Sequence, residues 1–133
     1  MSTRRALIIE DDDVFANLMA DWLKHLGCDS VRASDAVGGI NMAAAAPPDL
    51  IILDIMLPGF GSGVDALRLI RKNPRLLSVP IIVTTAMPIK RLKLPDDDPR
   101  LWSISKSAPP AELFALIKGA LWLDGTPPPT GQP

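Results

Sequence analysis

The sequence predicts an α/β domain in which helices cover both faces of a parallel sheet. Short aliphatic runs alternate with longer segments of helical periodicity along most of the 133 residues, and this alternation is typical of parallel sheets. Three of the runs, ALIIE, LIILDI and VPIIVTTA, are almost continuously apolar, as expected for strands that are buried on both faces. The length and a hydrophobic content of 47% fit one domain with one core.

The predicted elements follow one another with short connections over most of the chain. In chain order they are strand 6–10, helix 14–26, strand 28–34, helix 35–46, strand 50–55, helix 64–72, strand 79–86, strand 101–106 and helix 109–123. Each strand is a short run between turn signals, and each helix shows apolar residues at a spacing of three or four. The strand at 28–34 has the weakest pattern, because polar residues interrupt it.

Capping residues support the predicted helix boundaries. Asp12 or Asp13 is expected to cap the first helix, and Ser34 the second. Ser62, with Asp65 three residues later, resembles a capping box for the third. The prolines of PPAEL suit the first turn of the last helix. The expected helix-ending residues are Gly27 and Pro47.

One long connection departs from the alternation. The segment AMPIKRLKLPDDDPRLW carries Pro88, Pro95 and Pro99, so a helix in it could occupy at most IKRLKL. A long connection without regular structure is uncommon in a compact domain and often marks a functional segment. We therefore expect the helix between the last two strands to be short or replaced by a loop.

Composition excludes several classes of protein. A net charge of -1 provides no basic surface for nucleic acid. Cys28 is the only cysteine, which precludes an internal disulfide and fits a reducing compartment. No apolar run resembles a signal peptide or reaches the roughly 18 residues of a membrane span. We expect a soluble, cytoplasmic protein with one domain at residues 1–123 and a disordered, proline-rich tail at 124–133.

Carboxylates gather at one predicted edge of the sheet. Ligands of open parallel sheets bind at the carboxyl ends of the strands, where the first strand ends at Glu10, Asp11 and Asp12 and the third ends at Asp54. If these strands are neighbours, the like charges repel each other and raise a pKa unless a cation compensates them. Mg²⁺ is well suited, because it prefers oxygen ligands and binds through a few carboxylates, waters and phosphate groups.

The two remaining strands bring complementary groups to the same edge. Thr84 and Thr85 end the fourth strand, and Lys106 ends the fifth. The metal and the Lys106 ammonium would neutralise phosphate oxygens, while the Thr85 hydroxyl donates to another. A carboxylate in such a site can act as the nucleophile that receives a phosphoryl group.

These motifs, in this order, resemble the receiver domain of bacterial two-component response regulators. The match rests on LIIEDD, LDIMLPG, VPIIVTTA and the SK after the last strand, and it covers residues 5–123. The resemblance implies a flavodoxin-like, doubly wound sheet of five parallel strands in the order 2-1-3-4-5. It also implies a signalling phosphoacceptor that catalyses only its own phosphotransfer.

The resemblance assigns a role to each matched residue. Thr85 matches the family's switch hydroxyl, five residues after Pro80. The implied assignments are Asp54 as phosphoacceptor, Thr85 and Lys106 as its catalytic partners, and Glu10, Asp11, Asp54 and the backbone carbonyl of Met56 as ligands of Mg²⁺. A histidine kinase or a histidine phosphotransfer protein would donate the phosphoryl group. The chain would then signal as a single-domain regulator through contact with an unknown output protein, with association into a weak dimer left open.

The sequence departs from the family pattern at several positions. Ser107 stands where the family usually has proline, and Ser103 where it usually has an aromatic residue. With the proline-broken segment after Thr85, these departures favour an alternative, a pseudo-receiver that signals through fixed contacts without phosphorylation. A Mg²⁺-dependent phosphatase would need a second aspartate at the position of Met56. A flavin site would need a Ser/Thr/Gly-rich phosphate loop where the chain has the acidic EDDDVF, which would repel the phosphate, so flavin binding is excluded.

Overall fold

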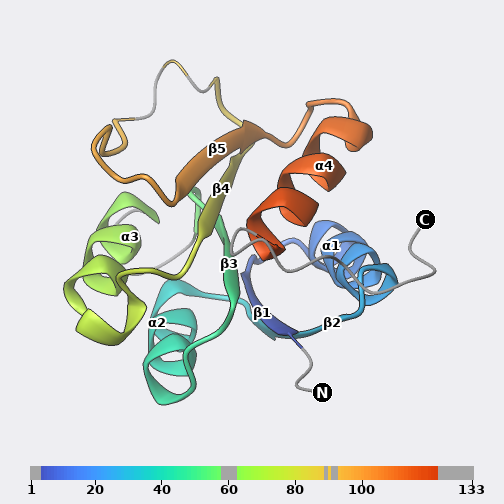
Figure 1. The fold of residues 1–133 in the computed structure, drawn as a ribbon. Helices are drawn as coiled ribbons and strands as arrows, with labels where there is room; N and C mark the ends of the chain where they lie inside the picture. The colour runs from blue at the N-terminus through green and yellow to red at the C-terminus, as the bar shows by residue number, and fades with distance from the viewer. Residues whose placement is uncertain (1–3, 58–62, 89, 91–92, 123–133) are drawn as a thin grey trace.

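The computed structural model describes residues 4–57, 63–88, 90 and 93–122, and it contains one five-stranded parallel sheet (Figure 1). The strands are β1 (Arg4–Ile9), β2 (Cys28–Ala33), β3 (Leu50–Asp54), β4 (Ile81–Thr85) and β5 (Leu101–Ser105). Their spatial order is β2-β1-β3-β4-β5, which confirms the predicted order. The central position of β3 places its carboxyl end between β1 and β4.

Helices cover both faces of the sheet and create two cores. They are α1 (Asp13–His25), α2 (Ala36–Ala45), α3 (Gly63–Lys72), the short 3-10 helix η1 (Pro74–Leu76) and α4 (Pro110–Leu121). In Figure 1, α1 and α4 lie on one face, and α2 and α3 lie on the other. Ile8, Ile52 and Ile82 belong to the core under α1 and α4, while Leu7, Leu53 and Val83 belong to the core under α2 and α3. Alternate residues of each central strand thus enter opposite cores, as the predicted apolar runs require.

Two helix starts test the capping predictions. Asp12 caps α1, and its side chain accepts hydrogen bonds from the N–H groups of Val14 and Phe15. The prediction for the second helix was one residue early, because Asp35 caps α2 and accepts a hydrogen bond of 2.7 Å from Gly38 N–H. Serine and aspartate are equally good caps, so the position at which the helix begins selects Asp35, whose carboxylate also suits the positive end of the helix dipole.

Two glycines permit close approach of helices to the sheet. A Cβ on Gly39 of α2 would lie 2.5 Å from Ile9 Cδ1, and a Cβ on Gly63 of α3 would lie 2.4 Å from Ile55 Cα. Gly63 N–H also donates to the carbonyl oxygen of Ile55 at 3.0 Å. These two glycines therefore let α2 and α3 pack directly on the strand ends near the predicted site.

The connection between β4 and β5 contains no α-helix among its described residues, 86–88, 90 and 93–100, in agreement with the expected short helix or loop. The last predicted helix is α4.

Arg71 of α3 anchors this connection through an ion pair. Its Nε lies 2.8 Å from Asp98 Oδ2, and both side chains are 15% exposed. The Arg71 guanidinium also donates to the carbonyl oxygens of Leu76, Val79 and Arg100. Ser62 and the predicted tail lie outside the described residues.

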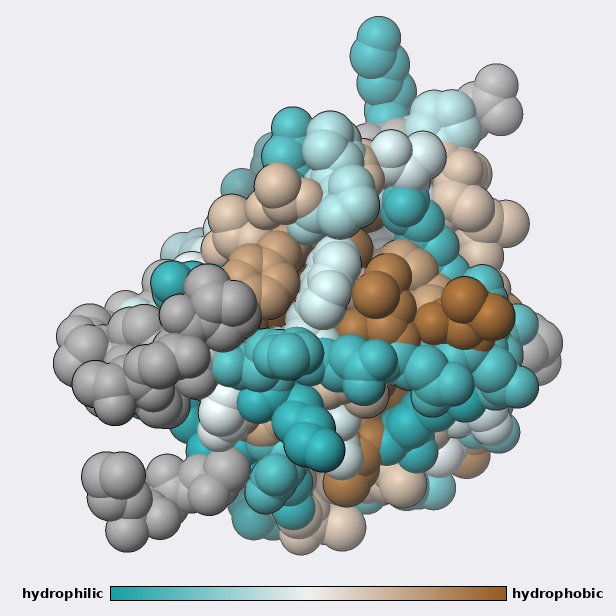
Figure 2. Space-filling view, turned by 90° about the vertical axis from the view of Figure 1, so that its right-hand side faces the viewer, coloured by the Kyte–Doolittle hydropathy of each residue, from teal (hydrophilic) through white to brown (hydrophobic). Residues whose placement is uncertain are grey.

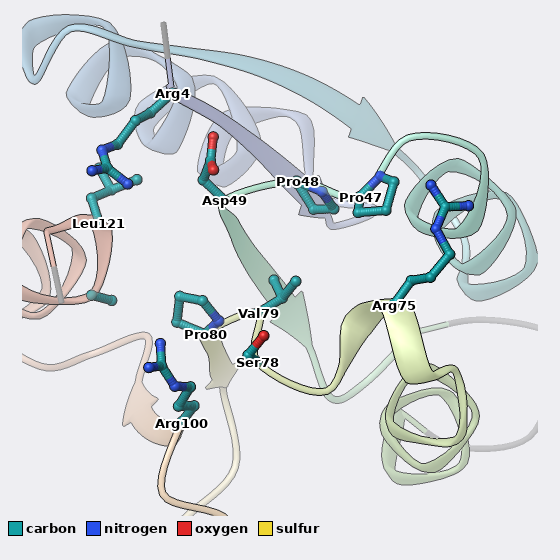
Figure 3. Close-up of a pocket in the computed structure, with 11 residues that line it drawn as sticks. Arg4, Pro47, Pro48, Asp49, Arg75, Ser78, Val79, Pro80, Arg100 and Leu121 are labelled. Carbon is teal, nitrogen blue, oxygen red and sulfur yellow. The ribbon is translucent and has the colours of Figure 1, made fainter. Parts of the chain in front are cut away.

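A pocket of about 300 Å³ opens at the amino ends of the strands, away from the predicted carboxylate site (Figure 3). Arg4, Arg75, Arg100 and Asp49 are among the residues that line it, and none of the predicted site residues does. The three arginine side chains point in different directions in Figure 3. The pocket therefore offers no group of charges that converges on one ligand position.

The side of the molecule that α1 and α4 cover has a mixed surface. Figure 2 shows a hydrophilic band with a small apolar area beside it. On α1, Val14 is 79% exposed and Leu18 is 40% exposed. None of the helices in the described part of the chain has the length and apolar character needed to cross a bilayer.

Candidate functional site

The carboxyl ends of β1 and β3 bring three carboxylates together. The two strands are paired with Ile9 opposite Leu53, so Glu10 and Asp54 leave the sheet side by side, as the sequence predicted for neighbouring strands. One carboxylate oxygen from each of Glu10, Asp11 and Asp54 lies within 4.8 Å of the others. Glu10 and Asp54 are buried and Asp11 is exposed. The cluster thus has a buried floor and one side open to solvent.

Glu10 is held at both carboxylate oxygens. Its Oε1 lies 2.7 Å from Lys106 Nζ, and its Oε2 accepts a hydrogen bond of 3.1 Å from Asp12 N–H. Burial raises the pKa of Glu10 to about 7; Lys106 and Asp12 N–H lower it, and neighbouring Asp54 raises it. The raised pKa expected for such a cluster is therefore present, but burial contributes more to it than the like charge does.

Asp54 has one oxygen fixed by the backbone and the other beside a cation. Its Oδ1 accepts a hydrogen bond of 3.0 Å from Met56 N–H, and its Oδ2 lies 3.4 Å from Lys106 Nζ. Ile55 N–H continues the sheet by donating to Thr84 O at 3.0 Å. These contacts hold the carboxylate in one orientation at the end of a rigid, fully buried strand.

Lys106 follows β5 and completes the charged cluster. Its N–H donates to Thr85 O at 2.8 Å, which fixes its backbone to the end of β4. Its side chain is 18% exposed. Burial by itself lowers the pKa of Lys106, but the carboxylates of Glu10 and Asp54 outweigh burial and raise it above its ordinary value. The ammonium is therefore charged across the physiological pH range.

Thr85 lies at the same edge, but its hydroxyl is engaged locally. The side chain is fully buried, and Oγ1 accepts a hydrogen bond of 3.0 Å from Met87 N–H. The hydroxyl proton can still be donated to another acceptor. Among the described residues, the structure thus joins Glu10, Asp11, Asp54 and Lys106 in one cluster, while Thr85 Oγ1 is bonded within its own turn.

Sequence reasoning missed two residues that contact the cluster. Arg32, near the end of β2, donates from Nε to the carbonyl oxygen of Glu10 at 3.0 Å and lies 2.6 Å from Asp13 Oδ1. The ring centroid of Phe15 lies 4.7 Å from Lys106 Nζ. A charged residue near the carboxyl end of a neighbouring strand was a signal for Arg32. Phe15 gave no such signal, because it fits the apolar face of α1 equally well.

The donor set suits a hard divalent cation. All three clustered side chains offer carboxylate oxygens, which Mg²⁺ prefers over nitrogen or sulfur ligands. Burial already makes the charged form of Glu10 costly, so a cation in the cluster would offset negative charge beyond what Lys106 compensates. The cluster therefore fits Mg²⁺ in both ligand type and charge.

The fold, the acidic cluster and the lysine are those of a signalling receiver, and comparison with known proteins gives the family directly. The chain belongs to the response regulator receiver domain family, whose model matches residues 6–94. It is 32% identical over 123 residues to the phosphate regulon transcriptional regulatory protein PhoB of Klebsiella pneumoniae, covering 89% of this chain and 52% of that protein. It is 28% identical over 88 residues to the polar-differentiation response regulator DivK of Brucella ovis, covering 66% of this chain and 71% of that protein. The chain thus spans about half the length of the PhoB protein that it matches.

Solved structures agree with this assignment. The receiver domain of a sensor histidine kinase from Pseudomonas aeruginosa PAO1, determined with a magnesium ion coordinated in the active-site cleft, is similar with a TM-score of 0.75 and 26% identity, covering 90% of this chain and 98% of that one. The BeF3-activated receiver domain of RstA from Klebsiella pneumoniae has a TM-score of 0.72 and 27% identity, covering 89% of this chain and 98% of that one. Chemotaxis protein CheY4 of Vibrio cholerae shares the fold, with a TM-score of 0.77 and 18% identity, covering 90% of this chain and 99% of that one.

Proposed function

We propose that this chain accepts a phosphoryl group on Asp54, in a Mg²⁺-dependent reaction, from a histidine kinase or a histidine phosphotransfer protein. The observation that carries the proposal is the setting of Asp54. Its carboxylate is 3% exposed, is oriented by Met56 N–H and lies beside both Lys106 Nζ and two further carboxylates. A buried carboxylate that is oriented by the backbone, with a lysine ammonium 3.4 Å away to stabilise incoming phosphoryl charge, is prepared to act as a nucleophile.

The transfer balances without any further reactant. One Asp54 carboxylate oxygen forms a bond to phosphorus, and the bond between phosphorus and the donor imidazole nitrogen breaks. The electron pair of that bond stays on the nitrogen that carried the phosphoryl group, and because the other ring nitrogen already carries a proton, the imidazole leaves as the neutral base. Lys106 Nζ, 3.4 Å from Asp54 Oδ2, is close enough to stabilise the negative charge on the phosphoryl oxygens as it develops.

The residues proposed to hold Mg²⁺ are Glu10, Asp11, Asp54 and the backbone carbonyl of Met56. When bound, the cation supplies positive charge that neutralises phosphoryl oxygens. Met56 N–H donates to Asp54 Oδ1, which keeps the backbone of Met56 close to the carboxylate of Asp54. Support also comes from the related Pseudomonas receiver domain, whose structure holds magnesium in its active-site cleft.

Thr85 is proposed as the residue that reports phosphorylation. Its hydroxyl oxygen accepts from Met87 N–H, so the hydroxyl proton is available to a phosphoryl oxygen on Asp54. Rotation of the Thr85 side chain toward that oxygen would break the bond to Met87 and release the start of the β4–β5 connection. Such a local change of hydrogen bonding can bias a pre-existing equilibrium between two arrangements of this connection.

The exposed side of α1 supports a protein as phosphoryl donor. Val14 and Leu18 lie one helical turn apart and are 79% and 40% exposed, and α1 begins directly after the acidic cluster. Two apolar side chains at this spacing give a partner a small apolar contact on the helix that begins at the acidic cluster. We propose that a separate output protein reads the phosphorylated state by direct contact.

The test is the intact mass of the protein after incubation with acetyl phosphate. We expect a gain of one phosphoryl group that requires Mg²⁺ and disappears with a chelator or in Asp54→Asn. Asp97→Asn, in the β4–β5 connection, is the matched control and should still gain the group. The alternative is a phosphorylation-independent pseudo-receiver, favoured by the lack of an α-helix among the described residues between β4 and β5. No gain of mass in the wild-type protein with Mg²⁺ present would favour that alternative.

A further inference from the structure

Ser107 follows Lys106 where the family pattern has proline, and the ammonium of Lys106 lies against Glu10, Asp54 and the ring of Phe15. We propose that the ring of Phe15 positions Lys106, by holding its ammonium against Glu10 and Asp54. Phe15 would then be a positioning residue of the phosphoryl-transfer site, acting through Lys106. This inference rests on the proposed function for its consequence, although the contact itself can be tested without phosphorylation.

The geometry encloses the ammonium between an aromatic face and two carboxylates. Lys106 Nζ lies 4.7 Å from the centroid of the Phe15 ring, 2.7 Å from Glu10 Oε1 and 3.4 Å from Asp54 Oδ2. The electron-rich face of a phenyl ring attracts a cation at this distance, and the attraction grows when the cation is withdrawn from water. With its side chain only 18% exposed, Lys106 is in that situation.

A single residue places both the ring and one of the carboxylates. Asp12 Oδ1 accepts from Phe15 N–H at 3.4 Å, and Asp12 N–H donates to Glu10 Oε2 at 3.1 Å. Phe15 is partly buried and packs on the core under α1 and α4. The cap of α1 therefore couples the position of the ring to the position of the carboxylate that Lys106 contacts.

The backbone of Lys106 is fixed by a different set of contacts. Ser105 and Ser107 share a hydrogen bond of 2.8 Å between their hydroxyl groups, and Ser107 N–H donates to Ser105 Oγ at 3.1 Å. Lys106 N–H donates to Thr85 O at 2.8 Å. These bonds fix the start of the side chain, but the flexible lysine stem beyond it has several rotatable bonds. The Phe15 ring restricts the far end of that stem.

Loss of the ring should affect the lysine more than the rest of the site. Without it, Lys106 would still have two carboxylate partners but would spend less time in the arrangement beside Asp54 Oδ2. The carboxylates that bind Mg²⁺ would keep their backbone supports. We therefore expect slower phosphoryl transfer with little change in Mg²⁺ affinity, a combination that general destabilisation of the fold would not produce.

The experiment compares Phe15→Leu, which keeps an apolar side chain, with Phe15→Tyr, which keeps the ring. The first readout is the chemical shift of the Lys106 Cε protons by NMR, since a ring close to the ammonium shifts them upfield. The second readout is the rate of phosphorylation by acetyl phosphate with Mg²⁺. Phe114→Leu is the matched control, because Phe114 packs on the same core, edge-on to Trp22.

We expect upfield-shifted Lys106 protons in the wild type and in Phe15→Tyr, and a loss of that shift in Phe15→Leu. We expect Phe15→Leu to be phosphorylated about threefold more slowly, the size of a modest cation–π contact, and Phe15→Tyr and Phe114→Leu to stay near the wild-type rate. Trifluorophenylalanine introduced at position 15 keeps the shape but weakens the ring's attraction for a cation, so it should also slow the reaction.

Two results would overturn the inference. Lys106 protons without an upfield shift in the wild type would show that the ring does not hold the ammonium. Equal rates for the wild type, Phe15→Leu and the trifluorinated protein would show that the contact does not serve the transfer. A wild-type protein that gains no phosphoryl group would instead overturn the proposed function, and the NMR comparison would still decide whether Phe15 positions Lys106.

Discussion

The carboxylate of Glu10 lies 2.7 Å from the ammonium of Lys106, and both side chains are largely buried. They come from opposite ends of the chain and meet only because β1 and β5 deliver their carboxyl ends to the same edge of the sheet. Asp54, at the end of the central strand, shares the same ammonium at 3.4 Å. Lys106 and a divalent cation would therefore bind to the same carboxylates, so the lysine both compensates their charge and competes with the metal.

This competition gives a prediction for Lys106→Met. Removing the ammonium takes away a positive charge beside the metal ligands, so we expect Mg²⁺ to bind at least as tightly as in the wild type, as measured by calorimetry. Phosphorylation by acetyl phosphate should nevertheless slow by about tenfold or more, because the group that stabilises phosphoryl charge is lost. Lys118→Met on α4 is the control. Weaker Mg²⁺ binding by Lys106→Met would show that the lysine organises the metal ligands.

Mg²⁺ affinity should depend on pH because burial raises the pKa of Glu10 to about 7. Below that pH the carboxyl of the metal-free protein holds a proton, which Mg²⁺ must displace. We expect the affinity to fall as the pH is lowered through 7, approaching about tenfold per pH unit. Calorimetry in buffers of different ionisation enthalpy would measure the released proton. Glu10→Gln should bind Mg²⁺ more weakly but without this pH dependence.

The same pKa shift has the opposite sign for the stability of the metal-free protein. The folded state binds a proton on Glu10 at a pH where the unfolded chain, with a pKa near 4.5, has lost it. The free energy of unfolding should therefore lose a contribution as the pH rises from 4.5 toward 7. Thermal unfolding with a chelator present, compared between the wild type and Glu10→Gln, measures this contribution. A wild-type profile parallel to that of Glu10→Gln would contradict it.

Thr84 and Thr85 are adjacent and equally buried, yet substitution by valine should change the free energy of unfolding in opposite directions at the two positions. Thr84 Oγ1 is buried and has no hydrogen-bond partner within the described part of the chain, whereas Thr85 Oγ1 accepts from Met87 N–H. Thr84→Val should raise the free energy of unfolding by about 1 kcal/mol, and Thr85→Val should lower it by about the same amount. Thermal or denaturant unfolding checks both. A destabilised Thr84→Val would mean that the hydroxyl has a partner.

The charged part of the site was predictable from the sequence, because its residues end apolar strands. Glu10 and Asp54 end aliphatic runs that indicate buried strands, Lys106 ends the more polar run LWSIS that fits a last strand, and a parallel sheet brings such ends together. Contacts that depend on side-chain orientation were not predictable. Strand spacing places Thr85 at the edge but does not show that its hydroxyl bonds to Met87 N–H.

The helices and strands of the fold were also predictable from the sequence, but the detailed contacts between them were not. Aliphatic strands and helical periodicity indicated the elements, while the strand order came from the family resemblance. The N-cap of α2 was misplaced by one residue because Ser34 and Asp35 are both good caps, and only the backbone geometry selects Asp35. The prolines after Thr85 indicated that the connection would lack a full helix, as its described residues do, but the ion pair of Asp98 with Arg71 needs a contact across distant parts of the chain.

Arg71 should be important for the β4–β5 connection. Its ion pair with Asp98 is 15% exposed on each side, and its guanidinium also donates to three backbone carbonyls. Arg71→Met should lower the free energy of unfolding by about 3 kcal/mol, since it leaves Asp98 and the carbonyls without their donor. Arg71→Lys should recover only part of this, because an ammonium lacks the planar fork of donors. Arg68→Met, on the exposed surface of α3, is the matched control in urea unfolding.

The lifetime of the phosphoryl group on Asp54 should depend on Met56 more than on Met87. Both methionines lie two residues after a site residue, and an apolar side chain there can hinder the water that attacks phosphorus. Met56 is 55% exposed next to Asp54, where it can cover the open side of the site. Met87 is partly buried and packs on the core under α2 and α3, which keeps it away from incoming water.

We therefore expect faster dephosphorylation in Met56→Asn, whose polar side chain can orient water, and a smaller change in Met87→Glu. Loss of the phosphorylated mass after removal of acetyl phosphate measures both rates, with Met42→Asn on the exposed surface of α2 as the control. If neither substitution at the site changes the rate, the methionines do not limit access of water, and the lifetime is set by the charged groups around Asp54.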